Sequence, residues 1–195
     1  MRNSRYFRRH KLKFAVFIVV ALAVVATQSG WLNSGVKSAQ QNQPGLYAID
    51  HFIDGDTIAV NMNGSVETIR MIGVDTPETH RPKTPVQCYG PVAANYTKSL
   101  IGSNRVRLQA DNLDTNRDRY GRLLRYVYLP DGRLVEDQLI ARGYGFAYTL
   151  FPFEKKPQFV AKQAAAKQAN VGLWGACSVT VDSSGREQTN AISTN

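Results

Sequence analysis

The fold is decided by residues 46–78, which read LYAIDHFIDGDTIAVNMNGSVETIRMIGVDTPE. Three apolar stretches rich in β-branched residues occur here, at residues 46–53, 57–62 and 66–74. Asp-Gly and Asn-Gly pairs separate them, and such pairs are typical of turns between strands. Asn63-Gly64 between two apolar stretches is a strong signal for a β-hairpin. The sequence therefore predicts three consecutive strands at the start of a domain.

Further elements follow this three-stranded start. Residues 75–88 contain three prolines, which exclude a regular helix or a central strand and predict a loop. We expect helices at residues 89–101, 134–141 and 157–169, and strands at residues 105–110 and 123–129. Elements in the order βββ-α-ββ-αα predict an α+β domain built on the OB-fold, a small five-stranded β-barrel that carries helices.

The first 39 residues have the composition of an export signal. They hold seven Lys or Arg residues and no acidic residue, and an unbroken apolar run covers residues 14–26. This pattern predicts a signal peptide, or an N-terminal membrane anchor formed by residues 14–32. A buried helix of the domain is the alternative. A cleaved signal peptide would give a secreted protein, and an uncleaved anchor a protein tethered to the membrane. In both cases we expect the domain to face an oxidising, extracytoplasmic compartment.

The rest of the chain divides into a linker, a domain and a tail. Residues 40–45 form a polar linker, residues 46–178 the domain, and residues 179–195 a Ser/Thr/Asn-rich stretch that we expect to be disordered. The whole chain has a formal net charge of +9, but residues 40–195 keep only +2. Bulk charge is therefore weak support for a nucleic-acid partner, and an argument for function needs a site.

The chain has two cysteines, Cys88 and Cys177, and both lie in the part that we expect to be exported. Only one pairing is open to them, and an oxidising compartment permits it. Two inert buried thiols, or an isolated pair of metal ligands, are the alternatives. We predict a Cys88–Cys177 disulfide that ties the start of the first helix to the end of the last one.

Two acidic tetrapeptides stand at strand ends. Asp54-Gly55-Asp56-Thr57 lies between the first two strands, and Asp75-Thr76-Pro77-Glu78 ends the third. If the strands pair, the carboxylates meet, and oxygen ligands from separate loops suit a hard cation such as Ca²⁺. Each tetrapeptide alone also fits an ordinary turn or chain reversal. Neither has the spaced acidic residues of an EF-hand loop, so a calcium-sensor motif is excluded.

Two arginines occupy positions suited to phosphate. Arg70 lies inside an apolar strand, where its guanidinium is paired or faces a functional cavity, unless the side chain points out to solvent. Arg122 follows a turn, Asp118-Arg119-Tyr120-Gly121, which presents it at the start of the next strand. Arginine forks match the geometry of phosphate oxygens.

Five segments of the chain together resemble the motifs of the staphylococcal nuclease (thermonuclease) family. They are Ile-Asp-Gly-Asp-Thr (53–57), Ile-Arg-Met-Ile-Gly-Val-Asp-Thr-Pro-Glu (69–78), Tyr-Gly-Pro (89–91), Asp-Arg-Tyr-Gly-Arg (118–122) and Gly-Leu-Trp (172–174). They occur in the family's order and at similar separations, over about residues 46–175. The resemblance implies an OB-fold barrel with three helices, which agrees with the elements expected above.

The resemblance also implies a metal site and a base. Asp56 and Asp75 match side-chain ligands of Ca²⁺, and Thr76 matches a ligand that uses its backbone carbonyl. Glu78 matches the general base of the reaction. The paired Cys88 and Cys177 have no counterpart in the type member of the family, so their disulfide is not implied by the resemblance.

Arginines and tyrosines complete the implied site. Arg70 and Arg122 match the two arginines that clamp the scissile phosphate, and Tyr120 and Tyr148 match tyrosines that line the nucleotide pocket. One position departs from the family: the aromatic residue expected two positions after Tyr148 is Leu150. We therefore expect weaker stacking on the base, or stacking supplied by a neighbour such as the next residue, a phenylalanine.

The function that the resemblance implies is calcium-dependent hydrolysis of phosphodiester bonds in DNA and RNA, with 3′-phosphate products. Single-stranded or frayed nucleic acid is the preferred substrate, little base readout is expected, and the protein is expected to act as a monomer. A binding module is the main alternative, because OB-folds also bind single strands without cutting them. The filled ligand, base and arginine positions favour the enzyme. A structural role at the cell envelope has only the N-terminal segment in its favour.

Overall fold

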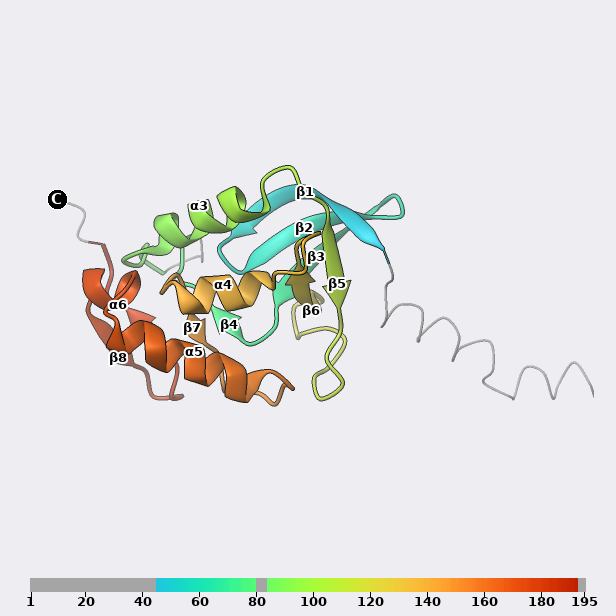
Figure 1. Cartoon of the computed structure of the whole chain (residues 1–195). Helices are drawn as coiled ribbons and strands as arrows, with labels where there is room; N and C mark the ends of the chain where they lie inside the picture. Colours follow the sequence, from blue (N-terminus) through green and yellow to red (C-terminus); the bar gives the residue numbers. More distant parts are fainter. Residues whose placement is uncertain (1–44, 80–83, 193–195) are drawn as a thin grey trace, which may run out of the picture. The chain divides into compact units, whose positions relative to one another are not determined.

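The computed structural model describes residues 45–79 and 84–192 (Figure 1). The expected signal peptide or anchor at residues 1–39, and nearly all of the expected linker, lie outside the described residues. Within the described ranges, no helix is both long enough and apolar enough to cross a membrane.

A closed barrel of five strands forms the first half of the fold, with the strand order β1-β2-β3-β6-β5. The strands are β1 (Leu46–Asp54), β2 (Thr57–Met62), β3 (Ser65–Met71), β5 (Val106–Gln109) and β6 (Leu123–Tyr128). All neighbours are antiparallel except β3 and β6, which run parallel. The expected α+β fold with an OB-type five-stranded barrel is confirmed.

The β2–β3 hairpin turns where the sequence predicts it. Asn63 and Gly64 both have positive φ angles, 53° and 90°, as a tight two-residue hairpin turn requires. From this turn the register runs without interruption, from Met62 opposite Ser65 to Thr57 opposite Arg70. The hairpin therefore fixes which residue of β3 lies beside the end of the β1–β2 loop.

The third expected strand, 66–74, is interrupted in the structure. It divides into β3 and a short strand β4 (Val74–Asp75), which pairs with β7 (Phe146–Ala147) outside the barrel. Gly73 lies at the break and has a φ of 71°, a value that favours glycine. Glycine is also needed here because a Cβ would come within 2.5 Å of the Phe153 ring. The interruption carries Asp75 away from the barrel wall.

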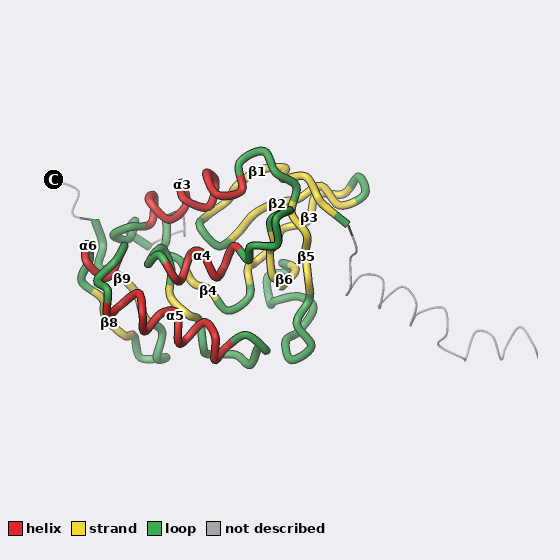
Figure 2. Tube along the Cα trace, viewed as in Figure 1, coloured by secondary structure: helices red, strands yellow, loops and turns green. Residues whose placement is uncertain are grey.

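In residues 45–79 and 84–192, four helices accompany the barrel: α3 (Gly90–Ile101), α4 (Val135–Ala141), α5 (Lys156–Gln168) and the short α6 (Leu173–Ala176). The first three start and end within one residue of the segments expected from the sequence, and α6 is an addition. Figure 2 shows α4 between α3 and α5, and it contacts both of them.

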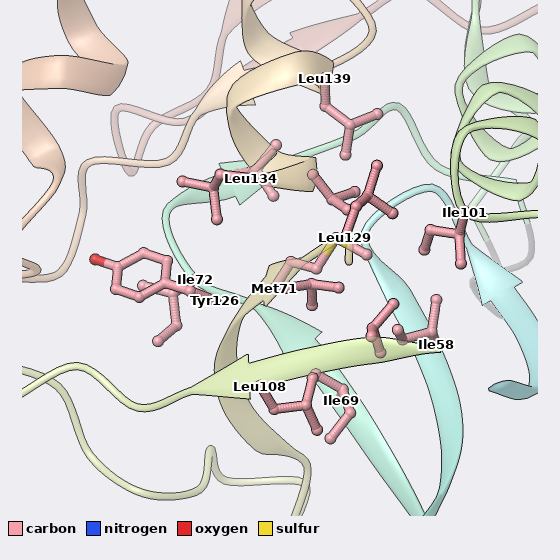
Figure 3. Packing of buried hydrophobic residues seen from close by; sticks show 14 of the residues in the cluster. Ile58, Ile69, Met71, Ile72, Ile101, Leu108, Tyr126, Leu129, Leu134 and Leu139 are labelled. Carbon is pink, nitrogen blue, oxygen red and sulfur yellow. The ribbon is translucent and has the colours of Figure 1, made fainter. Parts of the chain in front are cut away.

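The hydrophobic core joins the barrel to these helices (Figure 3). Side chains from the barrel interior meet side chains from α3 and α4. Six of those labelled in the figure are at most 2% exposed: Ile58, Ile69, Met71, Ile101, Leu108 and Leu139. Because one core serves both layers, the helices hold the barrel and the loops that leave it in fixed positions.

The C-terminal segment differs from the expected disordered tail. Residues 179–192 contain a two-stranded hairpin formed by β8 (Val179–Val181) and β9 (Glu187–Thr189). Asp182 shapes its turn, because its Oδ1 accepts hydrogen bonds from the backbone N–H groups of Ser184 and Arg186. Polar composition alone predicts disorder, but turn chemistry and contacts with the domain order this segment.

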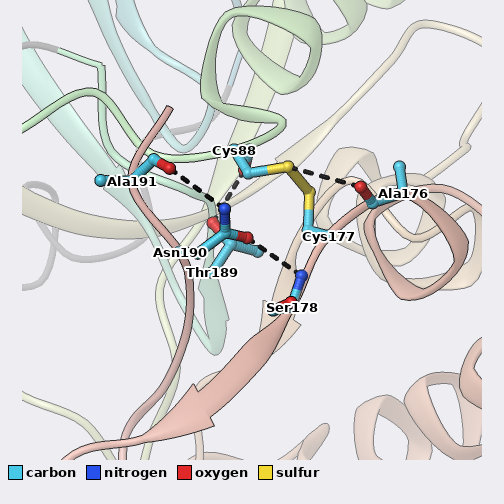
Figure 4. Close-up of a disulfide and its surroundings, with 7 residues drawn as sticks. All are labelled: Cys88, Ala176, Cys177, Ser178, Thr189, Asn190 and Ala191. Carbon is cyan, nitrogen blue, oxygen red and sulfur yellow. Dashed lines mark hydrogen bonds between the residues drawn. A yellow bond between two sulfur atoms is a disulfide. The ribbon is translucent and has the colours of Figure 1, made fainter. Parts of the chain in front are cut away.

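The predicted Cys88–Cys177 disulfide is present and anchors the hairpin (Figure 4). The Cys88 backbone N–H donates to the Asn190 carbonyl at 2.7 Å, and the Thr189 hydroxyl donates to the Cys88 carbonyl at 2.7 Å. Ser178 N–H donates to the side chain of Asn190 at 3.0 Å. The start of α3, the end of α6 and the strand β9 are thus tied together.

Removal of this disulfide should lower the stability of the protein. The bridge closes a loop between residues 89 positions apart, so a Cys88→Ser, Cys177→Ser double variant should lose about 4–5 kcal/mol of unfolding free energy. Denaturant unfolding of the oxidised protein and of the variant measures the difference. Wild-type protein with reductant is the control and should fall to the level of the variant; an unchanged midpoint in both cases contradicts the prediction.

Candidate active site

Two buried carboxylates and one arginine form the centre of the site. Asp56 stands just before β2, and the β2–β3 register places Arg70 opposite the next residue. The Arg70 guanidinium lies 2.9 Å from Asp56 Oδ2 and 3.0 Å from Asp75 Oδ1, and it also donates to the Val74 carbonyl. Its side chain is only 13% exposed, so it does not point out to solvent. Arg70 therefore holds two carboxylates from separate loops side by side.

Thr76 joins the same cluster through its backbone. Its N–H donates to Asp56 Oδ2 at 2.9 Å, while Asp56 Oδ1 accepts from the Thr57 hydroxyl at 2.9 Å. Gly55 permits this contact, because a Cβ there would come within 2.7 Å of Thr76 Oγ1. The two acidic tetrapeptides therefore meet, as strand pairing predicts.

The charges in this cluster depend on one another. Burial alone lowers the pKa of Arg70, but the charges of Asp56 and Asp75 outweigh it and raise the pKa above its usual value. Burial raises the pKa of Asp75, and the neighbouring arginines oppose that rise. Both carboxylates are less than a tenth exposed. Their burial is therefore tolerated because guanidinium groups accompany them.

Glu78 is linked to the cluster through Asp54, the last residue of β1. The two side chains share a hydrogen bond, and the Thr79 hydroxyl donates to Asp54 Oδ1 at 2.9 Å. The Glu78 backbone N–H donates to the side chain of Gln87 at 2.7 Å, which fixes the loop at this point. Burial, the charge of Asp56 and the bond with Glu78 raise the pKa of Asp54 to about 7. The candidate base thus lies beside a carboxyl group that titrates near neutral pH.

Arg122 stands just before β6, the strand that pairs with β3. Leu124, two residues further on, is the β6 partner of Arg70, so the two arginines come from neighbouring parts of the barrel. Asp118 holds Arg122 in place, with its Oδ2 2.7 Å from both Nε and Nη2. The ring of Tyr120, which is 68% exposed, lies 5.3 Å from this guanidinium.

Tyr148 approaches the cluster from the loop after β7. Its backbone N–H donates to the Gly73 carbonyl at 2.8 Å, and its phenol lies close enough to contribute to the raised pKa of Arg70. The Phe151 ring lies 5.9 Å from the Tyr148 ring, measured between centroids, and is 57% exposed. Phe151 therefore places a second, exposed aromatic ring beside Tyr148. In the described part of the chain, no ring contact joins Tyr148 to the other expected pocket tyrosine.

A residue outside every sequence motif also reaches the cluster. Arg186, from the turn between β8 and β9, places Nε 2.6 Å from Asp75 Oδ2 and Nη2 3.1 Å from Asp75 Oδ1. Asp75 therefore accepts hydrogen bonds from two guanidiniums, one on β3 and one on the C-terminal hairpin.

The donor atoms fit a hard cation. Within residues 45–79 and 84–192 no group of three or more His, Cys, Asp or Glu residues is arranged to hold a metal ion. Two carboxylates, those of Asp56 and Asp75, do lie side by side next to the backbone of Thr76. Thr76 Oγ1 is buried with no hydrogen-bond partner in the described residues. An oxygen-only donor set of this kind suits Ca²⁺ or Mg²⁺ better than a transition metal.

Comparison with known proteins assigns the chain to a family. Residues 68–176 match the family model described as staphylococcal nuclease homologue. A thermonuclease of Staphylococcus intermedius is 37% identical over 162 residues, which cover 80% of this chain and 94% of that protein. The chain belongs to the staphylococcal nuclease family. The SPbeta prophage-derived endonuclease YokF of Bacillus subtilis is 41% identical over 128 residues, but these span only 43% of its length.

Three residues of this staphylococcal nuclease domain were not identified as site residues from the sequence. Asp54 and Asp118 lie inside the family motifs, so their positions in the motifs could have identified them. In the structure Asp54 is hydrogen-bonded to Glu78, and Asp118 accepts a hydrogen bond from Arg122. Arg186 had no signal, because it lies in a segment whose composition predicts disorder.

Asp54→Asn should flatten the dependence of stability on pH. The pKa of Asp54 is raised from 3.8 to about 7, so the folded state holds this proton more tightly than the unfolded chain. Stability from the protonated form is then fully present below about pH 4 and is lost as the pH rises to about 7. The variant lacks this loss, so its free energy of unfolding should rise relative to that of the wild type between about pH 4 and pH 7.

Denaturant unfolding in chelator at several pH values measures this effect. Glu154→Gln, a substitution of an exposed carboxylate, controls for the loss of one charge. Parallel curves for wild type and Asp54→Asn contradict the prediction.

Proposed function

We propose that this chain is an exported, calcium-dependent nuclease that hydrolyses DNA and RNA and leaves 3′-phosphate ends. Membership of the staphylococcal nuclease family supports hydrolysis of phosphodiester bonds. The observation that best supports calcium-dependent catalysis is the contact of Arg70 with both Asp56 and Asp75, since it joins a cation site to a phosphate-binding group. The 3′-phosphate product rests on the family resemblance.

The metal is assigned to the carboxylates of Asp56 and Asp75 and the carbonyl of Thr76. When bound there, Ca²⁺ supplies positive charge to a non-bridging oxygen of the substrate phosphate. The two carboxylates lie side by side because Arg70 neutralises their mutual repulsion. Calcium is favoured over softer metals because the side chains and backbone offer only oxygen donors.

The arginines bind the phosphate and stabilise the charge that develops on it. Arg70 lies on β3 and Arg122 just before its partner strand β6, and Asp118 fixes the direction of the second guanidinium. Such preorganised donors act mainly on the five-coordinate transition state, where each contributes about 3–4 kcal/mol. Because both contacts are made to phosphate oxygens, they provide little discrimination between bases.

Glu78 takes the proton from the attacking water. Its carboxylate lies next to Asp54, and Gln87 holds the backbone of its loop, so the base has a defined position. The water attacks phosphorus in line with the 5′-oxygen, and its proton passes to the Glu78 carboxylate. The bond between phosphorus and the 5′-oxygen breaks, and the leaving oxygen takes a proton from solvent to become a hydroxyl. Tyr148 and Phe151 offer aromatic surface for the adjacent nucleotide.

Export and release are part of the proposal. The Cys88–Cys177 disulfide favours an oxidising compartment, in agreement with the basic and apolar segment at residues 1–39. We propose a monomer that is secreted or tethered through residues 14–32, and cell fractionation with mass analysis of the mature N-terminus tests which outcome occurs.

Activity should depend on calcium. The donor set predicts cleavage of denatured DNA with Ca²⁺ and none in excess chelator, while other hard divalent ions should support binding better than turnover. A gel assay on single-stranded DNA and RNA, with and without chelator, measures this. Binding without cleavage under every condition would support the alternative of an OB-fold binding module.

Glu78→Gln should reduce turnover by about 10²–10⁴ without loss of the fold, because glutamine keeps the shape but cannot accept the proton. Steady-state cleavage and circular dichroism measure the two properties. Glu154→Gln makes the same substitution at an exposed position and should leave the rate unchanged. A loss below about fivefold for Glu78→Gln would assign the base to another group.

A further inference from the structure

The C-terminal hairpin brings a third arginine to the site. Arg186 forms a two-point contact with Asp75, and its side chain is only 19% exposed. Its Nη2 and the Nη2 of Arg70 donate to the same oxygen, Asp75 Oδ1. The two guanidiniums are therefore neighbours, and an anion bound by Arg70 lies within reach of Arg186.

The hairpin holds Arg186 in this position by several independent contacts. Asp182 fixes the backbone on the N-terminal side, and the next residue, Glu187, accepts a hydrogen bond from Gln163 of α5 at 2.6 Å. Thr189 is bonded to Cys88, beside the disulfide (Figure 4). Arg186 is thus held by an ordered hairpin that is hydrogen-bonded to the rest of the domain.

The same turn lies against the expected nucleotide pocket. The phenol of Tyr148 lies close enough to Arg186, as well as to Arg70, to contribute to the raised pKa of each guanidinium. A Cβ at Gly185 would lie 3.9 Å from the side chain of Leu150. The turn that carries Arg186 therefore contacts one metal-ligand candidate, Asp75, and lies near the loop that carries the pocket aromatics.

Charge explains what the third arginine can do. The two carboxylates of the cluster, Asp56 and Asp75, are balanced by the two guanidiniums, Arg70 and Arg186. A divalent cation on the carboxylates leaves the cluster with two excess positive charges. A phosphate group neutralises such an excess, and guanidinium forks bind its oxygens in a two-point manner.

We propose that Arg186 is a third phosphate-binding arginine, which contacts the substrate strand once a divalent cation has bound the Asp75 carboxylate. This inference rests on the proposed nuclease function. A purely structural salt bridge is the competing role, in which Arg186 only attaches the hairpin to the domain.

The test measures binding of a fluorescent single-stranded oligothymidylate by anisotropy over a series of salt concentrations, with Ca²⁺. The background is full-length Glu78→Gln protein, so that cleavage is slow. Arg186→Gln should weaken binding about tenfold or more and reduce the slope of log K against log salt by about 0.7, the amount expected for one lost phosphate contact.

Matched variants separate this role from general charge and from folding. Arg133→Gln removes an arginine whose carboxylate partner, Asp131, is on an exposed turn, and it should leave the slope unchanged. Arg186→Lys keeps the charge but not the fork, so it should keep the slope and recover part of the affinity. Thermal unfolding of each variant reports on the attachment of the hairpin.

Equal binding by the Arg186→Gln and Arg133→Gln proteins overturns the proposal while leaving the nuclease function intact. Equal weakening by glutamine and lysine at position 186, with a shared drop in unfolding midpoint, also overturns it and assigns a structural role. If the parent protein neither binds nor cleaves single strands, the proposed function fails and the inference fails with it.

Discussion

The site depends on one guanidinium that is shared by two carboxylates. Without Arg70, Asp56 and Asp75 would repel each other at buried positions, and one of them would take up a proton. The β2–β3 register fixes Arg70 beside Asp56, and the turn at Gly73 returns Asp75 to the same guanidinium. The barrel thus specifies the spacing of the acidic groups through strand pairing, which is more rigid than a free loop.

Much of the barrel follows from short-range signals in the sequence. Asn63-Gly64 predicts its hairpin because few other residues accept two successive positive φ angles. The meeting of Asp56 with Thr76 follows once the strands pair, since both stand at strand ends. The break at Gly73 cannot be read from the neighbouring sequence, because the ring that fills the space beside the glycine belongs to Phe153, a residue distant in sequence.

What the sequence did not predict depends on long-range contacts. The raised pKa of Asp54 results from burial and from two neighbouring carboxylates, and none of these can be read from its position in a motif. The Arg186–Asp75 pair joins residues 111 positions apart. Composition indicates only that residues 179–195 are polar, whereas the disulfide at Cys177 determines where their hairpin docks.

Because the hairpin is docked on the domain, the folded unit extends beyond the end of the family match. The family match ends at Ala176, one residue before Cys177. A protein truncated at that boundary would keep every motif residue but would leave Cys88 as an unpaired thiol, free to cross-link two copies. It would also leave the buried Asp75 with one guanidinium instead of two.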